Sequence, residues 1–365
     1  MKSESHEPGK KLFVQDKIIL RNEDNGLIFY NRGEHLFYFY EGLFIEDLVS
    51  AGVTADAEAL FAFLAGKEDL LTKNVQSDSP INICWMVSGK CNLDCIYCFA
   101  DNKMTDASLP TTCEMDTAKH LVSFRPVSVV LTGGEPTLNP NLKDILLFFK
   151  GKVGNVIDTN GTTPQLTKLI PAIQETHTTV RLTVDILDDD ILNQVRPRIS
   201  VPGNADASYA QTEILKKNIR ALTEAGVPLV VHTVFTRYNI GKLEETAEEL
   251  LRLGVRRWHF YPVNYSVKCS AIYDSIKVSR QEGRAYAETL MARYGAYMKI
   301  TCPINDIGDR ERAVLLVDGN GRFCVDTVRH GNLYLGKDSH FPEMEDVRSG
   351  LDLALHQQAY LCNFW

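Results

Sequence analysis

The chain has 365 residues, of which 44% are hydrophobic and 24% are charged, and its formal net charge is −8. This composition is that of a globular protein with a large core, and the acidic balance argues against a general nucleic-acid binder, which needs a basic face. No apolar run is long enough to cross a bilayer, and the polar N-terminus lacks the apolar stretch of a signal peptide. We therefore expect a cytoplasmic protein with no membrane or nucleic-acid partner, whose cysteines are metal ligands or reduced thiols.

The first region, residues 10–76, is predicted to be a small α+β domain in which strands precede helices. Short runs of β-branched and aromatic residues predict the strands, and Leu60, Phe61 and Leu64 recur at helical spacing. The expected strands are 17–21, 27–31 and 35–40, with a hairpin turn over 31–34, and the expected helices are 43–50 and 54–65. A turn-rich stretch, 77–80, predicts the boundary of this region.

The second region, residues 77–275, alternates strands with helices. Its strands are short apolar runs, as expected for a parallel sheet that helices cover on the outside. The expected strands are 81–87, 127–132, 155–158, 180–185, 228–235 and 257–263; the expected helices are 115–124, 142–150, 164–175 and two more near 215–222 and 243–250. Six such units predict the α/β class and a partial (β/α)6 TIM-like barrel, in which reactive residues lie at the C-terminal strand ends.

The third region, residues 276–365, is predicted to be a small extension. We expect a helix over 279–294, a strand over 299–302, and a hairpin of 313–317 and 322–325 around the turn 318–321. Three cysteines, Cys302, Cys324 and Cys362, lie in this region.

Three further cysteines, Cys91, Cys95 and Cys98, follow the first predicted barrel strand in the run CNLDCIYC. Their spacing allows three thiolates to hold one small cluster, with no fourth cysteine beside them. A four-iron cluster held by three thiolates keeps one iron open, and S-adenosylmethionine can bind there and be cleaved reductively. A structural zinc site would need a fourth ligand, and a disulfide framework is typical of short secreted chains. The run therefore predicts an iron–sulfur cluster.

Polar motifs also follow the next three predicted strands, at their C-terminal ends. In order, CNLDCIYC, LTGGEPTLNP and DTNGT resemble the radical S-adenosylmethionine superfamily over about residues 80–264. The resemblance implies that the three cysteines ligate the catalytic cluster. It also implies contacts to S-adenosylmethionine from Tyr97, Gly133, Gly134, Glu135, Asn160, Asp185 and Arg196.

By this resemblance, the tyrosine lies against the adenine and the Gly-Gly-Glu segment holds the methionine amino group. The asparagine and the aspartate fall where ribose and carboxylate contacts are usual, and the arginine pairs with the methionine carboxylate through its forked donors. Structural roles remain open for each: a tight turn for the glycines, an ordinary turn for Asn160-Gly161, and core packing for Tyr97. Asp185 precedes an acidic run typical of a solvated face, and Arg196 could pair with that run.

The C-terminal cysteines resemble a reduced form of the auxiliary-cluster extensions called twitch and SPASM. Gly319 and Cys324 give G-x-x-x-x-C after Cys302. The resemblance implies a second 4Fe-4S cluster held by Cys302, Cys324 and Cys362, with Cys269 or an open position as the fourth ligand. The alternative is that these cysteines are buried thiols.

The N-terminal region resembles RiPP recognition elements, the small units that bind leader peptides of ribosomal peptide products by adding them to a strand edge. This resemblance rests on element order and on GLIFYNRGEHLFYFY. The alternative is a structural cap over the bottom of the barrel.

Together these features predict a radical S-adenosylmethionine enzyme that abstracts a hydrogen atom from a precursor peptide and gives a cross-link or an epimerised residue. A flavodoxin or ferredoxin would supply the electron. The alternatives are the same chemistry on a small molecule of a cofactor or nucleotide pathway, and a non-catalytic iron–sulfur or zinc scaffold. Strand alternation places Arg257, His259 and Tyr261 on one side of the last barrel strand, as candidates for the substrate face.

Overall fold

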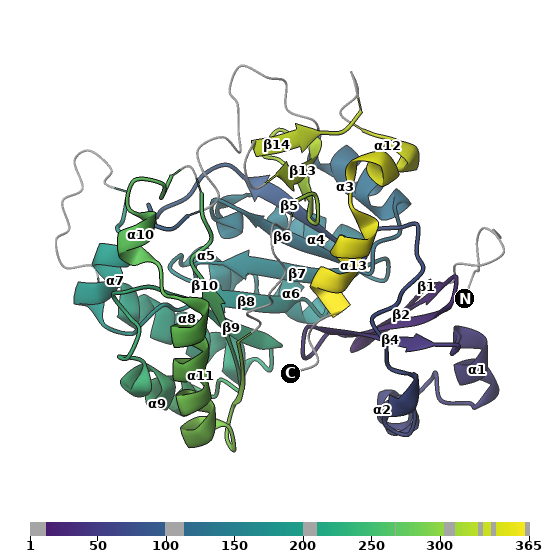
Figure 1. The fold of residues 1–365 in the computed structure, drawn as a ribbon, viewed down its shortest axis with the longest axis horizontal. Helices are drawn as coiled ribbons and strands as arrows, with labels where there is room; N and C mark the ends of the chain where they lie inside the picture. Colours follow the sequence, from purple (N-terminus) through teal and green to yellow (C-terminus); the bar gives the residue numbers. More distant parts are fainter. Residues whose placement is uncertain are drawn as a thin grey trace.

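The computed structural model describes residues 12–98, 113–199, 210–266, 268–302, 311–327, 331–336 and 341–361. Within these residues the strands form two sheets, an antiparallel sheet of four strands near the N-terminus and a larger sheet of ten strands. Figure 1 shows the small sheet and its helices lying against one end of the larger unit.

The small sheet contains the three predicted strands and one more. Its strands are β1 (Leu12–Val14), β2 (Ile18–Glu23), β3 (Gly26–Asn31) and β4 (Leu36–Glu41), paired in that order. Helices α1 (Ile45–Ser50) and α2 (Ala57–Ala65) and the 3-10 turn η1 (Glu68–Leu70) follow. β1 spans only three residues, which is too short to show alternation in sequence.

Both faces of the small sheet are buried. On one face Leu20 and Phe29 pack with Leu60 of α2. On the other face Tyr30 and Phe37 pack in a cluster that includes Ile81 and Val127, which directly precede the barrel strands β5 (Asn82–Ser88) and β6 (Ser128–Gly133). The N-terminal unit is therefore held between its own helices and the barrel by continuous apolar contact.

We expect the substitution Phe37→Ala to destabilise the whole chain. Phe37 is 1% exposed and stacks on Tyr30 with ring centroids 4.4 Å apart, and deleting such a ring costs about 3–5 kcal/mol. Denaturant unfolding should show this loss, whereas Val49→Ala, at a residue 58% exposed, should change stability by less than about 0.5 kcal/mol. If Phe37→Ala left the denaturant concentration at the unfolding midpoint unchanged, the N-terminal unit would not pack on the barrel.

The larger sheet contains all six predicted barrel strands, and sequence neighbours pair in parallel. They are β5 (Asn82–Ser88), β6 (Ser128–Gly133), β7 (Gly154–Thr159), β8 (Thr179–Thr183), β9 (Leu229–Phe235) and β10 (Arg257–Pro262). One face of every strand joins the main apolar cluster, which the helices cover in Figure 1. The prediction of a partial TIM-like barrel is confirmed.

Helices connect these strands with two differences from the expectation: the helix Asp189–Val195 was not predicted, and the helix predicted over 164–175 is divided. They are α3 (Glu114–Ser123), α4 (Leu142–Phe149), α5 (Gln165–Lys168), α6 (Ile170–Glu175), α7 (Asp189–Val195), α8 (Gln211–Glu224) and α9 (Glu244–Arg252), with the 3-10 turn η3 (Pro136–Leu138) before α4. The helix predicted over 164–175 is two helices that meet at Leu169, because Pro171 fits the first turn of α6 but offers no N–H to a continuous helix.

The C-terminal strands extend the barrel sheet at both of its edges. After α10 (Tyr273–Ile276) and α11 (Arg280–Tyr294), β11 (Lys299–Thr301) pairs in parallel with β10. At the other edge β12 (Leu315–Val317) pairs in parallel with β5, and β13 (Phe323–Thr327) and β14 (Gly331–Tyr334) continue the sheet. The predicted hairpin is present, but it covers the open edge of β5. The expected domain boundaries near residues 76 and 275 stay predictions.

Two final helices, α12 (Met344–Gly350) and α13 (Leu353–Leu361), lie beside the barrel. His356 of α13 is fully buried, and its Nε2 accepts a hydrogen bond of 2.9 Å from the backbone N–H of Ile81. None of the helices in the described ranges has the length and apolar character needed to span a membrane.

Candidate active site

The three cysteines of the CNLDCIYC run lie together on the loop that follows β5. Cys91, Cys95 and Cys98 are each partly exposed. Burial raises the pKa of the Cys95 thiol to about 12, and Cys98 and Cys91 are close enough to add to that rise. The three thiols share one loop and are partly exposed, but no set of three His, Cys, Asp or Glu side chains in the described ranges is arranged to hold a metal ion, so a cluster on them stays a prediction.

The backbone of this loop is fixed by the segment that follows α7. The N–H of Asp94 donates to the carbonyl of Pro197 at 2.7 Å, and the N–H of Ile96 donates to Val195 at 3.0 Å. Ile199 donates back to the carbonyl of Asn92 at 3.1 Å. Backbone hydrogen bonds, which do not involve the thiols, therefore hold the loop that carries the cysteines.

The glycine pair at the end of β6 allows the backbone to approach this loop closely. A Cβ on Gly133, whose φ is +135°, would lie 2.3 Å from the carbonyl oxygen of Ser88. A Cβ on Gly134 would lie 2.4 Å from the carbonyl oxygen of Lys90 and 3.0 Å from the Cβ of Cys91. Both positions require glycine for steric reasons. A contact of the pair with a methionine amino group stays a prediction.

We expect Gly134→Ala to displace the cysteine loop, because the new methyl group overlaps backbone atoms that cannot rotate away. The measurement is the iron and sulfide bound per chain after anaerobic reconstitution, which should fall to less than half of the wild-type value. The matched control is Gly66→Ala, where the nearest atom lies 3.5 Å from the added Cβ. Wild-type iron content in Gly134→Ala would contradict the steric role.

Glu135 follows the glycine pair and is fully buried. Its Oε1 accepts hydrogen bonds from the hydroxyls of Thr137 at 2.6 Å and Thr159 at 2.7 Å, and its Oε2 accepts from the N–H of Asn160 at 2.8 Å. Burial raises the pKa of this carboxyl, and these donors oppose the rise. Glu135 therefore ties the end of β6 to the end of β7, and contact with a cofactor amino group stays a prediction.

Asn160 links the end of β7 to the cysteine loop. Its Nδ2 donates to Asn92 Oδ1 at 2.8 Å and to the sulfur of Cys91 at 3.8 Å, and its Oδ1 accepts from Thr162. The carbonyl of Asn160 accepts from Arg196 Nη2 at 2.7 Å. The asparagine of this turn thus has a positioning role beyond the turn itself.

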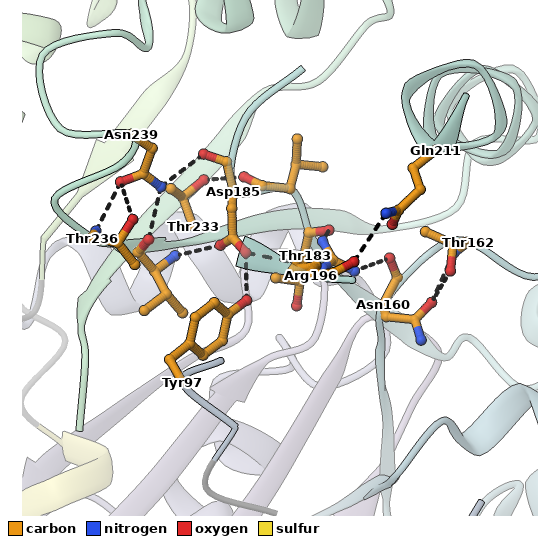
Figure 2. Close-up of polar contacts among 12 residues, drawn as sticks. Tyr97, Asn160, Thr162, Thr183, Asp185, Arg196, Gln211, Thr233, Thr236 and Asn239 are labelled. Carbon is orange, nitrogen blue, oxygen red and sulfur yellow. Dashed lines mark hydrogen bonds and ion pairs between the residues drawn. The ribbon is translucent and has the colours of Figure 1, made fainter. Parts of the chain in front are cut away.

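Tyr97, Asp185 and Arg196 form a network of polar contacts (Figure 2). The Tyr97 hydroxyl donates to Asp185 Oδ2, and Arg196 Nε lies 4.0 Å from the same oxygen. The backbone N–H of Val234 donates to Asp185 Oδ1 at 2.9 Å, which links this network to β9. Burial raises the pKa values of Asp185 and Tyr97. Asp185 lies two residues beyond β8, which ends at Thr183, and not within a strand as predicted.

Arg196 is held in place but keeps one buried donor without a partner. Its Nη1 donates to the carbonyl of Thr183 at 2.7 Å, and its other terminal nitrogen donates to Asn160. Its Nε has no hydrogen-bond partner although it is buried. This charged donor lies 4.0 Å from Asp185 Oδ2 without a hydrogen bond, and beside three thiols it fits a further anionic group such as a carboxylate. The acidic run, residues 188–190, has other partners: Asp188 caps α7, and Asp189 accepts a hydrogen bond from Thr212. Arg196 pairs with Asp185 and not with this run.

The C-terminal cysteines do not lie together in the described part of the chain. Cys302 directly follows β11 at one edge of the ten-stranded sheet, whereas Cys324 lies in β13 near the other edge, with seven strands between them. Cys324 packs with Met86 and Leu316. Cys269 packs with Ile96 and Tyr97 beside the first cysteine loop. Cys362 lies outside the described residues, and a cluster on these cysteines stays a prediction.

Several residues that support the site were missed in the sequence. Buried Thr137 and Thr159 donate to Glu135. Asn239, also buried, donates to the carbonyl of Asp185 at 3.0 Å. The available signal was their position near strand ends, because Thr159 ends β7 and Thr137 and Asn239 lie four residues beyond the ends of β6 and β9.

The family comparison agrees with this geometry. Residues 85–250 match the model of the Radical SAM superfamily, and this range includes the cysteine loop and every residue described around Arg196. Residues 85–250 therefore form a radical SAM domain. The radical SAM region begins within β5 and ends within α9.

Curated relatives resemble this chain over part of their length. Mycofactocin maturase MftC of Mycobacterium tuberculosis is 29% identical over 181 residues, which are 48% of this chain and 43% of MftC. The AdoMet-dependent heme synthase of Methanosarcina barkeri is 26% identical over 193 residues, which are 51% of each protein. The chain thus spans about half the length of these relatives.

A solved structure shares the fold over most of the chain. SuiB of Streptococcus suis, bound to S-adenosylmethionine, superposes with a TM-score of 0.61 at 15% identity and covers 94% of each chain. At this identity the likeness concerns the fold alone.

Proposed function

We propose that this radical SAM protein is an enzyme that cleaves S-adenosylmethionine reductively and abstracts a hydrogen atom from a precursor peptide. The product would be a cross-linked or epimerised peptide. The observation that carries this proposal is the loop of three neighbouring thiols beside Arg196, whose buried Nε has no hydrogen-bond partner and lies 4.0 Å from Asp185 Oδ2.

Cys91, Cys95 and Cys98 would hold the catalytic cluster, and their partial exposure leaves room for a second molecule beside it. When bound, a 4Fe-4S cluster supplies the electron that opens the sulfonium of S-adenosylmethionine and yields a 5′-deoxyadenosyl radical. The chain's part is to bind, orient and exclude water. Arg196 would hold the methionine carboxylate, and the glycine pair would keep the loop open to the cofactor.

The peptide substrate is supported by two of the similar proteins. MftC is named a maturase of mycofactocin, and SuiB has been solved bound to its precursor peptide SuiA. The heme-synthase relative supports the alternative, in which the same chemistry acts on a small molecule.

The N-terminal unit supports peptide binding only indirectly. Its sheet is buried on both faces, so a leader peptide would have to reach a strand edge, as in β-augmentation. The same burial favours a structural role as a cap, which the sequence left as the alternative.

We propose one catalytic cluster with an external donor such as a flavodoxin or ferredoxin. A second cluster on Cys302, Cys324 and Cys362 is disfavoured by the separation of β11 and β13 in the sheet. Without it, hydrogen-atom return from a thiol would give epimerisation, and Cys269 is the candidate nearest the cysteine loop, since it packs against Tyr97.

The triple substitution Cys91→Ala, Cys95→Ala and Cys98→Ala tests the cluster. We expect the reconstituted wild type to bind about four irons and to form 5′-deoxyadenosine when reduced, and the triple variant to bind none and form none. The single variant Cys113→Ala, at an exposed thiol outside the loop, is the matched control. About four irons remaining in the triple variant would establish a second cluster, and zinc in place of iron would sink the proposal.

The substrate class is tested by co-expressing the chain with short peptides encoded beside its gene. Loss of two hydrogens from such a peptide indicates a cross-link, and one deuterium gained in D₂O indicates epimerisation. An unchanged peptide together with turnover of a porphyrin would favour the small-molecule alternative.

A further inference from the structure

The inner face of the barrel sheet carries polar side chains that the radical SAM motifs do not include. Alternation along the strands sends one set of residues into the helix-covered apolar cluster and the other set to the inner face. The inner-face residues that keep partial exposure are Cys84, Thr132, Asp158, Arg181, Thr183, His232, Val234 and Tyr261. Solvent therefore reaches this face from within the barrel.

An ion pair lies in the middle of this face. Asp158 of β7 and Arg181 of β8 are paired directly in the sheet register, and Arg181 Nε and Nη2 donate to the two carboxylate oxygens. The side chains are 30% and 16% exposed, respectively. Arg181 lies four residues before Asp185, which corresponds to about 13 Å along an extended chain. The pair therefore lies below the proposed cofactor site, on the strand that leads to Asp185.

The N-terminal unit closes the far end of this face. His35, in the turn between β3 and β4, has a φ of +52°. Its Nε2 lies 3.1 Å from Arg181 Nη1 and its Nδ1 lies 2.9 Å from the Tyr30 hydroxyl. Because a guanidinium only donates, His35 Nε2 must accept, and the ring is therefore neutral. Next to it, Glu34 pairs with Arg257 at 3.6 Å and with Lys299 at 3.8 Å.

On the inner face, uncharged aromatic rings lie beside the Asp158–Arg181 ion pair. His232 stacks on His259 with ring centroids 5.5 Å apart and contacts Tyr261 at 5.0 Å. The Nε2 of His232 is buried without a hydrogen-bond partner. Burial lowers the pKa of His259 to about 3 and that of His232 well below its usual range. The side chains of His232, His259 and Tyr261 around the ion pair are thus uncharged but able to form hydrogen bonds.

The ion pair retains both hydrogen-bond donors, on Arg181, and hydrogen-bond acceptors, on Asp158, that are not yet used. After the bonds to Asp158 and His35, Arg181 Nη1 and Nη2 each retain one N–H. Each oxygen of Asp158 retains a further lone pair. A carboxamide matches this arrangement, because its C=O accepts from arginine while its N–H donates to aspartate. A carboxylate would meet Asp158 with like charge.

We propose that Asp158 and Arg181, with His35 behind them and His232 beside them, form a binding site for an uncharged carboxamide of the substrate. This inference rests on the proposed function and narrows its substrate class: the amide comes from the peptide backbone or from a glutamine or asparagine side chain. A polycarboxylate such as a porphyrin does not suit the site.

Three small probes test the site on the full chain, reconstituted and saturated with S-adenosylmethionine. They are the N-acetyl, N-methylamide derivatives of glutamine, glutamate and alanine, titrated by saturation-transfer NMR at pH 7.5. A side-chain amide ligand predicts that glutamine binds at least ten-fold more tightly than both glutamate and alanine. Binding of alanine as tightly as glutamine would identify the backbone amide, which all three probes share, as the ligand.

The variant Asp158→Asn should reverse the preference, because the site then carries the unbalanced charge of Arg181. Glutamate should gain at least ten-fold over glutamine. The double variant Asp158→Leu with Arg181→Leu removes both charges, leaves neither unpaired, and should weaken glutamine binding at least ten-fold. The control Asp274→Asn, in an exposed ion pair with Lys277, should bind all probes as the wild type does.

Tighter binding of glutamate than of glutamine and alanine by the wild type, or no saturable binding of any probe, would overturn this inference. An unchanged preference in folded Asp158→Asn would also overturn it; if that variant does not fold, the double variant decides. Formation of 5′-deoxyadenosine by the same wild-type preparation tests the proposed function separately. A preparation that makes 5′-deoxyadenosine but gives either of these wild-type results contradicts the amide site alone.

Discussion

The site depends on the close approach of two backbone segments, the end of β6 and the loop after β5. The N–H groups of Gly134 and Glu135 donate to the carbonyls of Ser88 and Lys90, both at 2.7 Å. This approach leaves no space for a side chain at either glycine. Glu135 then carries the connection to β7, and Asn160 returns it to Cys91. The positions of the cysteines thus follow from hydrogen bonds that close a ring of three strand ends.

Several buried charges in this protein are paired, because desolvating a lone charge is costly. Arg21 pairs with Glu23 on β2, Arg181 with Asp158 on the inner face, and Arg196 with Asp185 beside the cysteines. Nη2 of Arg21, Oε2 of Glu23 and Nε of Arg196 are buried without a hydrogen-bond partner. The proposal of a ligand at Arg196 therefore rests on its position beside the cysteines as well.

The terminal regions complete the barrel. The turn between β3 and β4 closes one end through His35 and Glu34, and the C-terminal strands cover the edges that β5 and β10 would otherwise expose. Both arrangements join residues far apart in the chain. They also explain why the first and third regions, which look separate in sequence, share apolar clusters with the barrel.

The sequence by itself determined the six barrel strands, the order of their helices and the three cysteines, because apolar runs and ligand spacing are local properties. Several apolar strands also include a charged or histidine side chain, such as Asp158, Arg181 and His232, to which the sequence pattern alone assigned no role. Only the tertiary structure decided what these do, since a pairing such as Asp158 with Arg181 depends on sheet register and barrel curvature. The same holds for Cys302 and Cys324, which share a region of the sequence but lie toward opposite edges of one sheet.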